Sequence, residues 1–153
     1  MVVNVEREIL LTGVGGQGIQ LAAQVLARAG VADGREVMLL GTYGGTMRGG
    51  STDSCLVIAD GPIRTPPIVS RVWAVLAMHD RFFAPSGAKL RAGSLAFVNS
   101  DLFESKIDAP GVRVLGVEAT RVANQVASSM GASLVLVAGF AGATGLVTLG
   151  SLL

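Results

Sequence analysis

The sequence predicts an α/β protein with one open, mostly parallel sheet, an antiparallel hairpin and helices on both faces. Near the N-terminus an apolar strand, a glycine-rich turn, an amphipathic helix and a second strand follow one another, which is the order of a βαβ unit. Val72–Met78 is apolar on both faces, as is typical of a central parallel strand. Half of the 153 residues are hydrophobic and 15% are charged, so we expect residues 1–153 to form a single Rossmann-like domain.

The first βαβ unit is predicted from short segments of distinct pattern. Arg7–Thr12 contains an apolar run and is expected to be the first strand. Gln17–Ala29 has apolar residues at helical spacing and is expected to end at Gly30. Arg35–Leu40 is the second strand, and the crossover between the two parallel strands is expected to be right-handed.

No crossover helix is predicted after the second strand, because residues 41–53 are rich in glycine and lack a helical period. Cys55–Ala59 is expected to be a third strand, and Asp60–Pro62 to form a turn that leads into Ile63–Arg64. We therefore expect a loop and a hairpin between residues 42 and 65, which would add an antiparallel pair to the sheet.

The remaining chain alternates strands and helices. Further strands are predicted at Ser94–Val98 and Val112–Val117, and helices at Asp80–Leu90, Ala119–Met130 and Ser133–Leu149. Asp80 is expected to cap the first of these helices.

The segment from Val122 to Leu153 contains no charged residue, which formally meets the length criterion for a membrane span. Its polar residues, its glycines and the absence of basic residues on its C-terminal side favour helices buried against a sheet instead. We therefore expect no membrane span. Gly139, Gly142 and Gly145 are spaced three apart, which suits a helix that packs closely against another element.

Composition excludes several classes of protein. The net charge of +1 provides no basic field for nucleic acid or for a membrane surface. Cys55 is the only cysteine and His79 the only histidine, so the chain by itself is expected to build no disulfide, iron–sulfur cluster or other metal site. The charges at residues 6–8 interrupt any signal peptide, and a cytoplasmic protein is expected.

Gly13–Gly18 matches the pattern G-x-G-x-x-G between a strand and a helix. Glycines allow backbone amides to approach an anion, and the helix N-terminus adds partial positive charge. The carboxylate that would bind a ribose hydroxyl at the end of the second strand is absent, since Leu40–Thr42 occupies that place. Either the turn binds a phosphate-like group, or its glycines only permit a tight turn and close packing.

A second glycine-rich segment, Thr42–Ser51, contains Tyr43 and Arg48 and follows the second strand at the same edge of the sheet. An arginine there suits a phosphate or a carboxylate, and the alternative is a surface loop with one solvated arginine. Asn99 ends another strand at that edge and is either a turn-former or a ligand contact. His79 is expected at the surface or in a cap, Cys55 in the core, and Trp73 in the core or at an interface.

These motifs together resemble a known family. Gly-Val-Gly-Gly-Gln-Gly-Ile, then Tyr-Gly-x-x-x-Arg-Gly-Gly-Ser, then a strand and Gly-Pro-Ile, are similar to the gamma subunit of the 2-oxoacid:ferredoxin oxidoreductases. The resemblance extends to Arg91–Asn99 and to Gly142–Leu153. The chain departs from the family at Gly45–Met47, where a proline and an acidic residue are common, so Tyr43 and Arg48 remain the candidate side chains of this segment.

The resemblance implies a subunit without catalytic groups of its own. Its holoenzyme would convert a 2-oxoacid to an acyl-CoA and reduce ferredoxin or a similar acceptor. Thiamine diphosphate, magnesium and iron–sulfur clusters would be held by alpha, beta and, where present, ferredoxin-like delta subunits. The gamma subunit would pack on the alpha subunit and help to close the coenzyme A side of the active site.

Two alternatives to this function remain open at the level of sequence. One is a self-sufficient Rossmann-type nucleotide-binding oxidoreductase, and the other is a pure interaction domain without a small-molecule ligand. The residues expected to bind a ligand or to contact another subunit are Gly13, Gly15, Gly16, Gln17, Gly18, Tyr43, Arg48, Gly49, Gly50 and Asn99. No catalytic residue is assigned.

Overall fold

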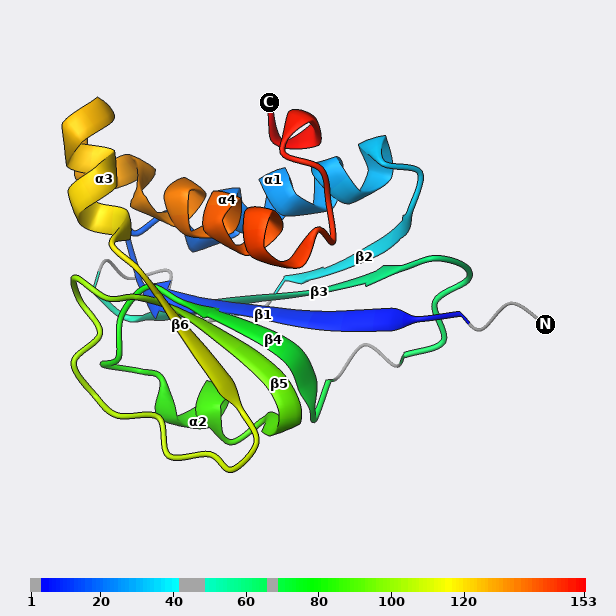
Figure 1. The fold of residues 1–153 in the computed structure, drawn as a ribbon, viewed down its shortest axis with the longest axis horizontal. Helices are drawn as coiled ribbons and strands as arrows, with labels where there is room; N and C mark the ends of the chain where they lie inside the picture. The colour runs from blue at the N-terminus through cyan, green and yellow to red at the C-terminus, as the bar shows by residue number, and fades with distance from the viewer. Residues whose placement is uncertain (1–3, 42–48, 66–68) are drawn as a thin grey trace.

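The computed structural model describes residues 4–41, 49–65 and 69–153. These residues form one sheet of six strands in the order β2-β3-β1-β4-β5-β6 (Figure 1). The strands are β1 (Glu6–Val14), β2 (Glu36–Gly41), β3 (Ser51–Ala59), β4 (Val72–Ala77), β5 (Leu90–Asn99) and β6 (Arg113–Val117). The helices are α1 (Ile19–Ala32), α2 (Ala84–Gly87), α3 (Ala119–Val126) and α4 (Ala132–Thr144), with 3-10 turns η1 (Ser129–Gly131) and η2 (Gly150–Leu152).

The sheet is mixed, as predicted. The pairs β1–β4, β4–β5 and β5–β6 are parallel, whereas β3 is antiparallel to both of its neighbours, β1 and β2. The predicted βαβ unit is present, but β3 lies between its two parallel strands. The expectation of a hairpin at Ile63–Arg64 is wrong, since no strand forms there. Both edges of β3 are already paired, so no edge remains for this segment.

The helices cover the two faces of the sheet unequally. Figure 1 shows α1, α3 and α4 on one face and only the short α2 on the other. The predicted helix at Asp80–Leu90 is therefore wrong for all but the four residues of α2. Pro85 stands in the first turn of that helix, where its ring is tolerated, but the carboxylate of Asp80 makes its hydrogen bonds with a distant loop instead of with the helix.

Each face of the sheet has its own buried apolar cluster. Along β1, Ile9 and Leu11 belong to the cluster beneath α1 and α4, while Leu10 between them belongs to the cluster on the opposite face. This alternation follows from the two-residue period of a strand. The second cluster is covered by Phe83 and Phe103, whose rings pack edge to face at 5.0 Å.

Glycines shape the helices in ways that their spacing does not reveal. Gly30 was expected to end the first helix, but α1 continues to Ala32 and Gly30 is buried against β2. A Cβ atom at Gly30 would lie 2.8 Å from Cγ2 of Val37. In α4 only Gly139 packs closely, since its Cβ would lie 3.2 Å from Val117, and Gly142 faces open space. Gly145 ends the helix with φ of 67°.

The uncharged C-terminal segment packs on the sheet, as predicted. Leu136 and Phe140 of α4 are fully buried, and the ring of Phe140 contacts Trp73 and Phe97 edge to face. Trp73 is half-buried, with the guanidinium of Arg7 above its ring at 4.7 Å. None of the helices in the described part of the chain is both long and apolar enough to cross a membrane.

The glycines of α1 and α4 provide a matched pair of substitutions. Gly142→Ala is expected to raise the free energy of unfolding by about 0.5–1 kcal/mol, because alanine loses less backbone entropy in a helix and nothing obstructs its Cβ. Gly30→Ala is expected to lower it by about 1–3 kcal/mol, because the stiff Val37 side chain must move. Urea denaturation of both variants measures this difference, and equal effects would contradict the packing assigned to Gly30.

Candidate functional site

The arrangement of strands places a crevice between the carboxyl ends of β1 and β4. These strands are parallel neighbours, with Ile9 opposite Ala74 and Thr12 opposite Ala77. The chain leaves β1 for α1 on one face of the sheet and leaves β4 for α2 on the other (Figure 1). Open α/β sheets bind ligands where consecutive connections diverge in this way. The edge predicted from the glycine motif is therefore also the edge that the topology favours.

The two glycine-rich segments meet at this edge. The N–H of Gly15 donates to the carbonyl of Gly50 at 2.7 Å, and the N–H of Gly49 approaches the carbonyl of Gly15 at 3.4 Å. The antiparallel pairing of β1 with β3 brings them together, because its last pair is Val14 opposite Ser51. Two other candidates in the second segment, Tyr43 and Arg48, lie outside the described residues.

The glycines of the first segment serve different physical purposes. A Cβ at Gly13 would lie 2.7 Å from Oε1 of Gln17, so this position requires a close approach of strand and helix. Gly18 has φ of 75°, and its Cβ would lie 3.1 Å from the hydroxyl of Ser133 on α4. Gly16 also has a positive φ, 98°, but nothing lies near its Cβ position. Tight packing thus accounts for Gly13 and Gly18, whereas Gly16 borders open space.

The start of α1 leaves amides available at the site. Gln17 closes the turn, because its Oε1 accepts from the N–H of Val14 at 2.7 Å and its own N–H donates to the carbonyl of Val14 at 3.1 Å. The first intrahelical bond runs from the N–H of Ala22 to the carbonyl of Gly18. The N–H groups of residues 19–21 therefore have no acceptor within the helix, and they carry the positive end of its dipole.

A cavity of about 280 Å³ lies beside this turn. Its described lining residues come from the ends of β1 and β4, the loop after β5, and the starts of α3 and α4, namely Gly16, Gln17, Met78, Leu102, Thr120, Ser129, Met130 and Ala132. These side chains are apolar or uncharged. The described lining therefore offers backbone and hydroxyl dipoles to a ligand but no group that could serve as a general acid or base.

Asn99 is fully buried at the carboxyl end of β5. Its Oδ1 accepts from the N–H groups of Ala119 and Thr120 at 3.2 and 3.4 Å, and its Nδ2 donates to Oγ1 of Thr120 at 2.9 Å and to the carbonyl of Met78 at 3.4 Å. The amide thus caps α3 from a neighbouring strand and holds Thr120, which lines the cavity.

Asp80 anchors the loop that follows β5. Its Oδ2 accepts from the N–H groups of Glu104 and Ser105 and from the hydroxyl of Ser105, at 2.8–2.9 Å. These bonds, those from Ser105 above all, lower the pKa of the Asp80 carboxyl below its usual range. The expectation that Asp80 caps a helix is wrong. Its neighbour His79 accepts from the N–H of Arg81 through Nδ1 and is partly exposed.

The only cysteine lies in the core, as predicted. Burial raises the pKa of the Cys55 thiol to about 11, so the nucleophilic thiolate is suppressed at neutral pH. Residues 4–41, 49–65 and 69–153 contain no group of three His, Cys, Asp or Glu side chains placed to hold a metal ion.

Several cavity residues were not predicted from the sequence. Met78 could have been found, because it directly follows a central parallel strand, where ligand contacts often lie. Ser129 and Met130 belong to an uncharged region without a recognisable motif, and Thr120 lies between Glu118 and Arg121 in a segment that also has none. Only the tertiary packing of α3 and α4 against the first turn brings them to the site.

The fold and the site define an α/β domain with a glycine-rich turn at one edge of its sheet. Beside this turn lie the N–H groups at the start of α1 and an uncharged cavity. Residues 8–153 match the family described as pyruvate ferredoxin/flavodoxin oxidoreductase, and the chain belongs to this family. It is 30% identical over 125 residues to the 2-oxoglutarate synthase subunit KorC of Methanocaldococcus jannaschii, covering 80% of this chain and 66% of that subunit.

Two solved structures extend the comparison. The gamma subunit of a keto/oxoacid ferredoxin oxidoreductase from Geobacter sulfurreducens superposes with a TM-score of 0.79 and 27% identity, covering 95% of this chain and 82% of that one. The 2-oxoglutarate:ferredoxin oxidoreductase of Magnetococcus marinus, solved with 2-oxoglutarate, coenzyme A and succinyl-CoA bound, gives a TM-score of 0.83 at 17% identity. This chain covers 26% of that one, and the likeness shows a shared fold.

Replacing Asn99 by alanine is expected to lower the free energy of unfolding by about 1–3 kcal/mol, because buried amides of α3 lose their acceptor. Thermal denaturation measures the loss, and hydrogen exchange is expected to increase at residues 119–120. Asn99→Asp keeps an acceptor for those amides but loses the donor to the Met78 carbonyl and buries a charge, so it is expected to be destabilised while exchange at residues 119–120 stays slow. Unchanged stability of the alanine variant would contradict the capping role.

Asp80 gives a pH-dependent prediction. Because its pKa is lowered by folding, the stabilisation is complete above the ordinary aspartate pKa of about 3.9 and is lost as pH falls through the lower folded value. Asp80→Asn is therefore expected to destabilise the protein at pH 7 and to reduce the loss of stability as the pH falls below about 4. Unfolding measured across this range tests the sign, and parallel pH profiles for the two proteins would contradict it.

Proposed function

We propose that this chain is the non-catalytic gamma subunit of a multisubunit 2-oxoacid:ferredoxin oxidoreductase. The complex would form an acyl-CoA from a 2-oxoacid, using thiamine diphosphate, magnesium and iron–sulfur clusters held by its alpha and beta subunits and by a ferredoxin-like delta subunit where one is present. Ferredoxin or a similar acceptor would take the electrons. This chain would pack on the alpha subunit in the cytoplasm and close the coenzyme A side of the active site.

The observation that carries this proposal is the meeting of the two glycine segments, through Gly15 and Gly50, beside a neutral cavity. Free helix amides favour an anionic group such as a phosphate of coenzyme A. The described cavity lining has no acid or base with which to carry out the chemistry itself. A chain that supplies part of a binding surface and leaves catalysis to its partners accounts for both properties.

In this proposal Gly16 borders the coenzyme A side, the N–H groups at the start of α1 face it, and Tyr43 and Arg48 supply a hydroxyl and a cation. Asn99 contributes indirectly, since it positions Thr120 at the cavity. An interaction domain without a small-molecule ligand is the competing function, and the close packing at Gly13 and Gly18 favours it, because those glycines are explained without a ligand.

Arg48→Ala in the assembled complex distinguishes these functions. Loss of one charge-assisted contact is expected to raise the apparent Michaelis constant for coenzyme A by about tenfold to a hundredfold and to leave assembly intact. Steady-state kinetics at saturating 2-oxoacid measure this effect. Arg71→Ala is the control, because Arg71 is exposed at the opposite end of β4.

Native mass spectrometry of the tagged chain, purified from its own host, shows whether the chain is part of an oxidoreductase complex. Co-purifying chains that carry thiamine diphosphate and iron–sulfur clusters are expected. If Arg48→Ala abolishes assembly and the Michaelis constant of the remaining complex is normal, the interaction domain is the better description. A partner-free chain that retains a nucleotide would overturn the proposal in favour of a self-sufficient enzyme.

A further inference from the structure

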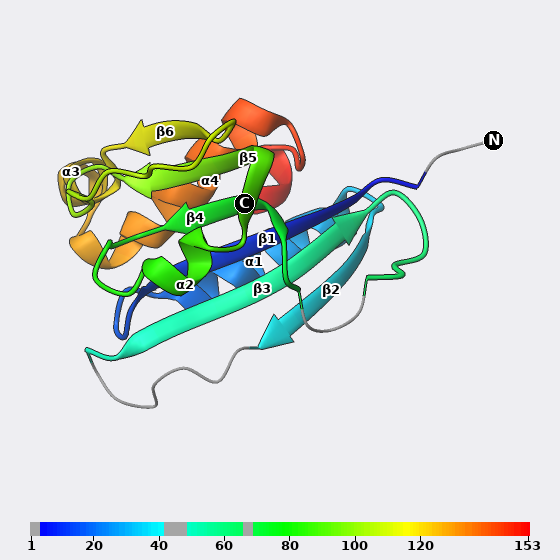
Figure 2. The ribbon, with the colours of Figure 1, turned by 90° about the horizontal axis from the view of Figure 1, so that it is seen from below.

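The loop that follows β5 forms one wall of the cavity. Residues 100–105 contain no helix or strand, and they leave β5 at the edge of the sheet where the parallel strand β4 also ends (Figure 2). Leu102 is the residue of this loop that lines the cavity. Because surface loops are ordinarily mobile, the attachments of this loop decide how firmly Leu102 is placed.

The first half of the loop is bound to β6, α3 and the end of β5. The N–H of Ser100 donates to the last carbonyl of β6 at 2.9 Å, and Oδ2 of Asp101 accepts from the N–H of Arg121 on α3 at 2.8 Å. The N–H of Leu102 itself donates to the carbonyl of Asn99 at 3.0 Å, which closes a tight turn. The backbone of Leu102 is therefore fixed from this side.

The second half of the loop is bound to the segment that follows β4. The ring of Phe103 packs edge to face on Phe83, and Oδ2 of Asp80 accepts from the N–H groups of Glu104 and Ser105 and from the hydroxyl of Ser105. Hydrogen bonds to an ionised carboxylate are stronger than those to a neutral acceptor. Each residue from 100 to 105 is thus attached through its backbone or its side chain, and the side chain of Leu102 faces the cavity.

The cavity has an apolar side as well as the polar side formed by the turn before α1. Leu102 shares the apolar side with the thioether side chains of Met78 and Met130. Met78 is buried, whereas Met130 is 81% exposed at the rim. A methionine side chain is flexible and adapts to its neighbour, whereas Leu102 is a stiffer side chain on a fixed loop. Leu102 therefore sets the shape of the cavity on this side.

We propose that Leu102 determines which uncharged groups the cavity accepts, and that Asp80 is the positioning residue that holds Leu102 in place. The Leu102 side chain packs against the uncharged part of coenzyme A that adjoins its bound phosphate. The attached loop keeps the side chain in that position before the ligand arrives, so little ordering is needed on binding. The identity of the ligand rests on the proposed function, and the attachment of the loop by Asp80 does not.

Removing the Leu102 side chain tests the contact. Leu102→Ala in the assembled complex is expected to raise the apparent Michaelis constant for coenzyme A about tenfold, because apolar contact area is lost. The turnover number and the Michaelis constant for the 2-oxoacid are expected to stay unchanged, because the contact is the same before and during the reaction. Leu102→Met keeps the volume of the wall and is expected to retain the wild-type constant.

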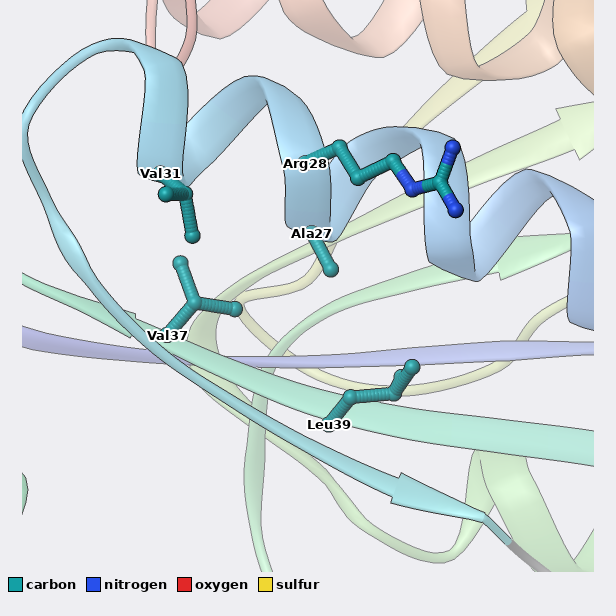
Figure 3. Close-up of a pocket in the computed structure, with 5 residues that line it drawn as sticks. All are labelled: Ala27, Arg28, Val31, Val37 and Leu39. Carbon is teal, nitrogen blue, oxygen red and sulfur yellow. The ribbon is translucent and has the colours of Figure 1, made fainter.

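The groove between α1 and β2 supplies a control at a distance from the cavity (Figure 3). Its volume is about 310 Å³, and Figure 3 shows Val31 of α1 and Val37 of β2 pointing toward each other across it. Val31 is 63% exposed near the C-terminal end of α1, whereas the cavity lies at the start of that helix. Val31→Ala also shortens an exposed apolar side chain and is expected to leave the Michaelis constant for coenzyme A unchanged.

A double variant tests whether Asp80 acts through Leu102. Asp80→Ala is expected to raise the Michaelis constant for coenzyme A about twofold to tenfold, because the released loop must be ordered on binding. In a Leu102→Ala background the same change is expected to add less than about twofold, because the contact that Asp80 positions is already absent. A merely structural effect of Asp80 would multiply with that of Leu102→Ala. Hydrogen exchange is expected to become faster at residues 104–105 in Asp80→Ala.

Two results would overturn this inference while the proposed function stands. One is a Michaelis constant for coenzyme A in Leu102→Ala no higher than that in Val31→Ala, and the other is multiplication of the Asp80→Ala and Leu102→Ala effects. Native mass spectrometry of each variant complex confirms that its subunits are unchanged. A wild-type chain without oxidoreductase partners would instead overturn the proposed function, together with the ligand named here, and no variant is needed to observe it.

Discussion

The antiparallel register of β3 on β1 is the constraint on which the candidate site depends. Nine residue pairs, from Glu6 opposite Ala59 to Val14 opposite Ser51, fix where β3 begins. Because the last pair lies at the carboxyl end of β1, the segment before β3 must arrive beside the turn after β1. The bond from Gly15 to Gly50 is the result. A register shift by two residues would move the second segment about 6.6 Å along the strand and separate the two motifs.

The position of β3 between β1 and β2 also explains why the helices cover the two faces of the sheet unequally. With β3 between β1 and β2, α1 must cross over an antiparallel strand, and it packs on both β2 and β3 through Gly30, Val37 and Ile58. The parallel half of the sheet is covered on that side by α4, whose hydroxyl at Ser133 reaches the carbonyl of Gly18. The opposite face carries mainly loops, which Asp80 holds in place. The site is thus supported from the helical side and bordered by loops on the other.

Much of this architecture could be predicted from periodicity. The strand pattern of Val72–Met78 and the helical pattern of Gln17–Ala29 are local, and both elements formed close to their expected bounds. The predictions for Gly30 and Asp80 were wrong because their partners, Val37 and the loop at Ser105, are set by tertiary packing. Asn99 ends a strand, as predicted, but its capping of α3 depends on a helix twenty residues further along the chain. Local sequence patterns therefore predict helices and strands. The hydrogen-bond partners of a polar side chain depend on which distant residues the fold places beside it.

The uncharged lining of the cavity has a consequence for experiments on the assembled protein. Neither the hydroxyls of Thr120 and Ser129 nor the amide of Gln17 gains or loses a proton between pH 5 and 9. Backbone dipoles at the start of α1 also keep their strength throughout that range. Whatever binds beside these described groups experiences a field from them that is constant in pH. A bell-shaped pH profile of turnover in a complex containing this chain would therefore report on ionisations outside this lining, in the ligand or in the chains that carry out the chemistry.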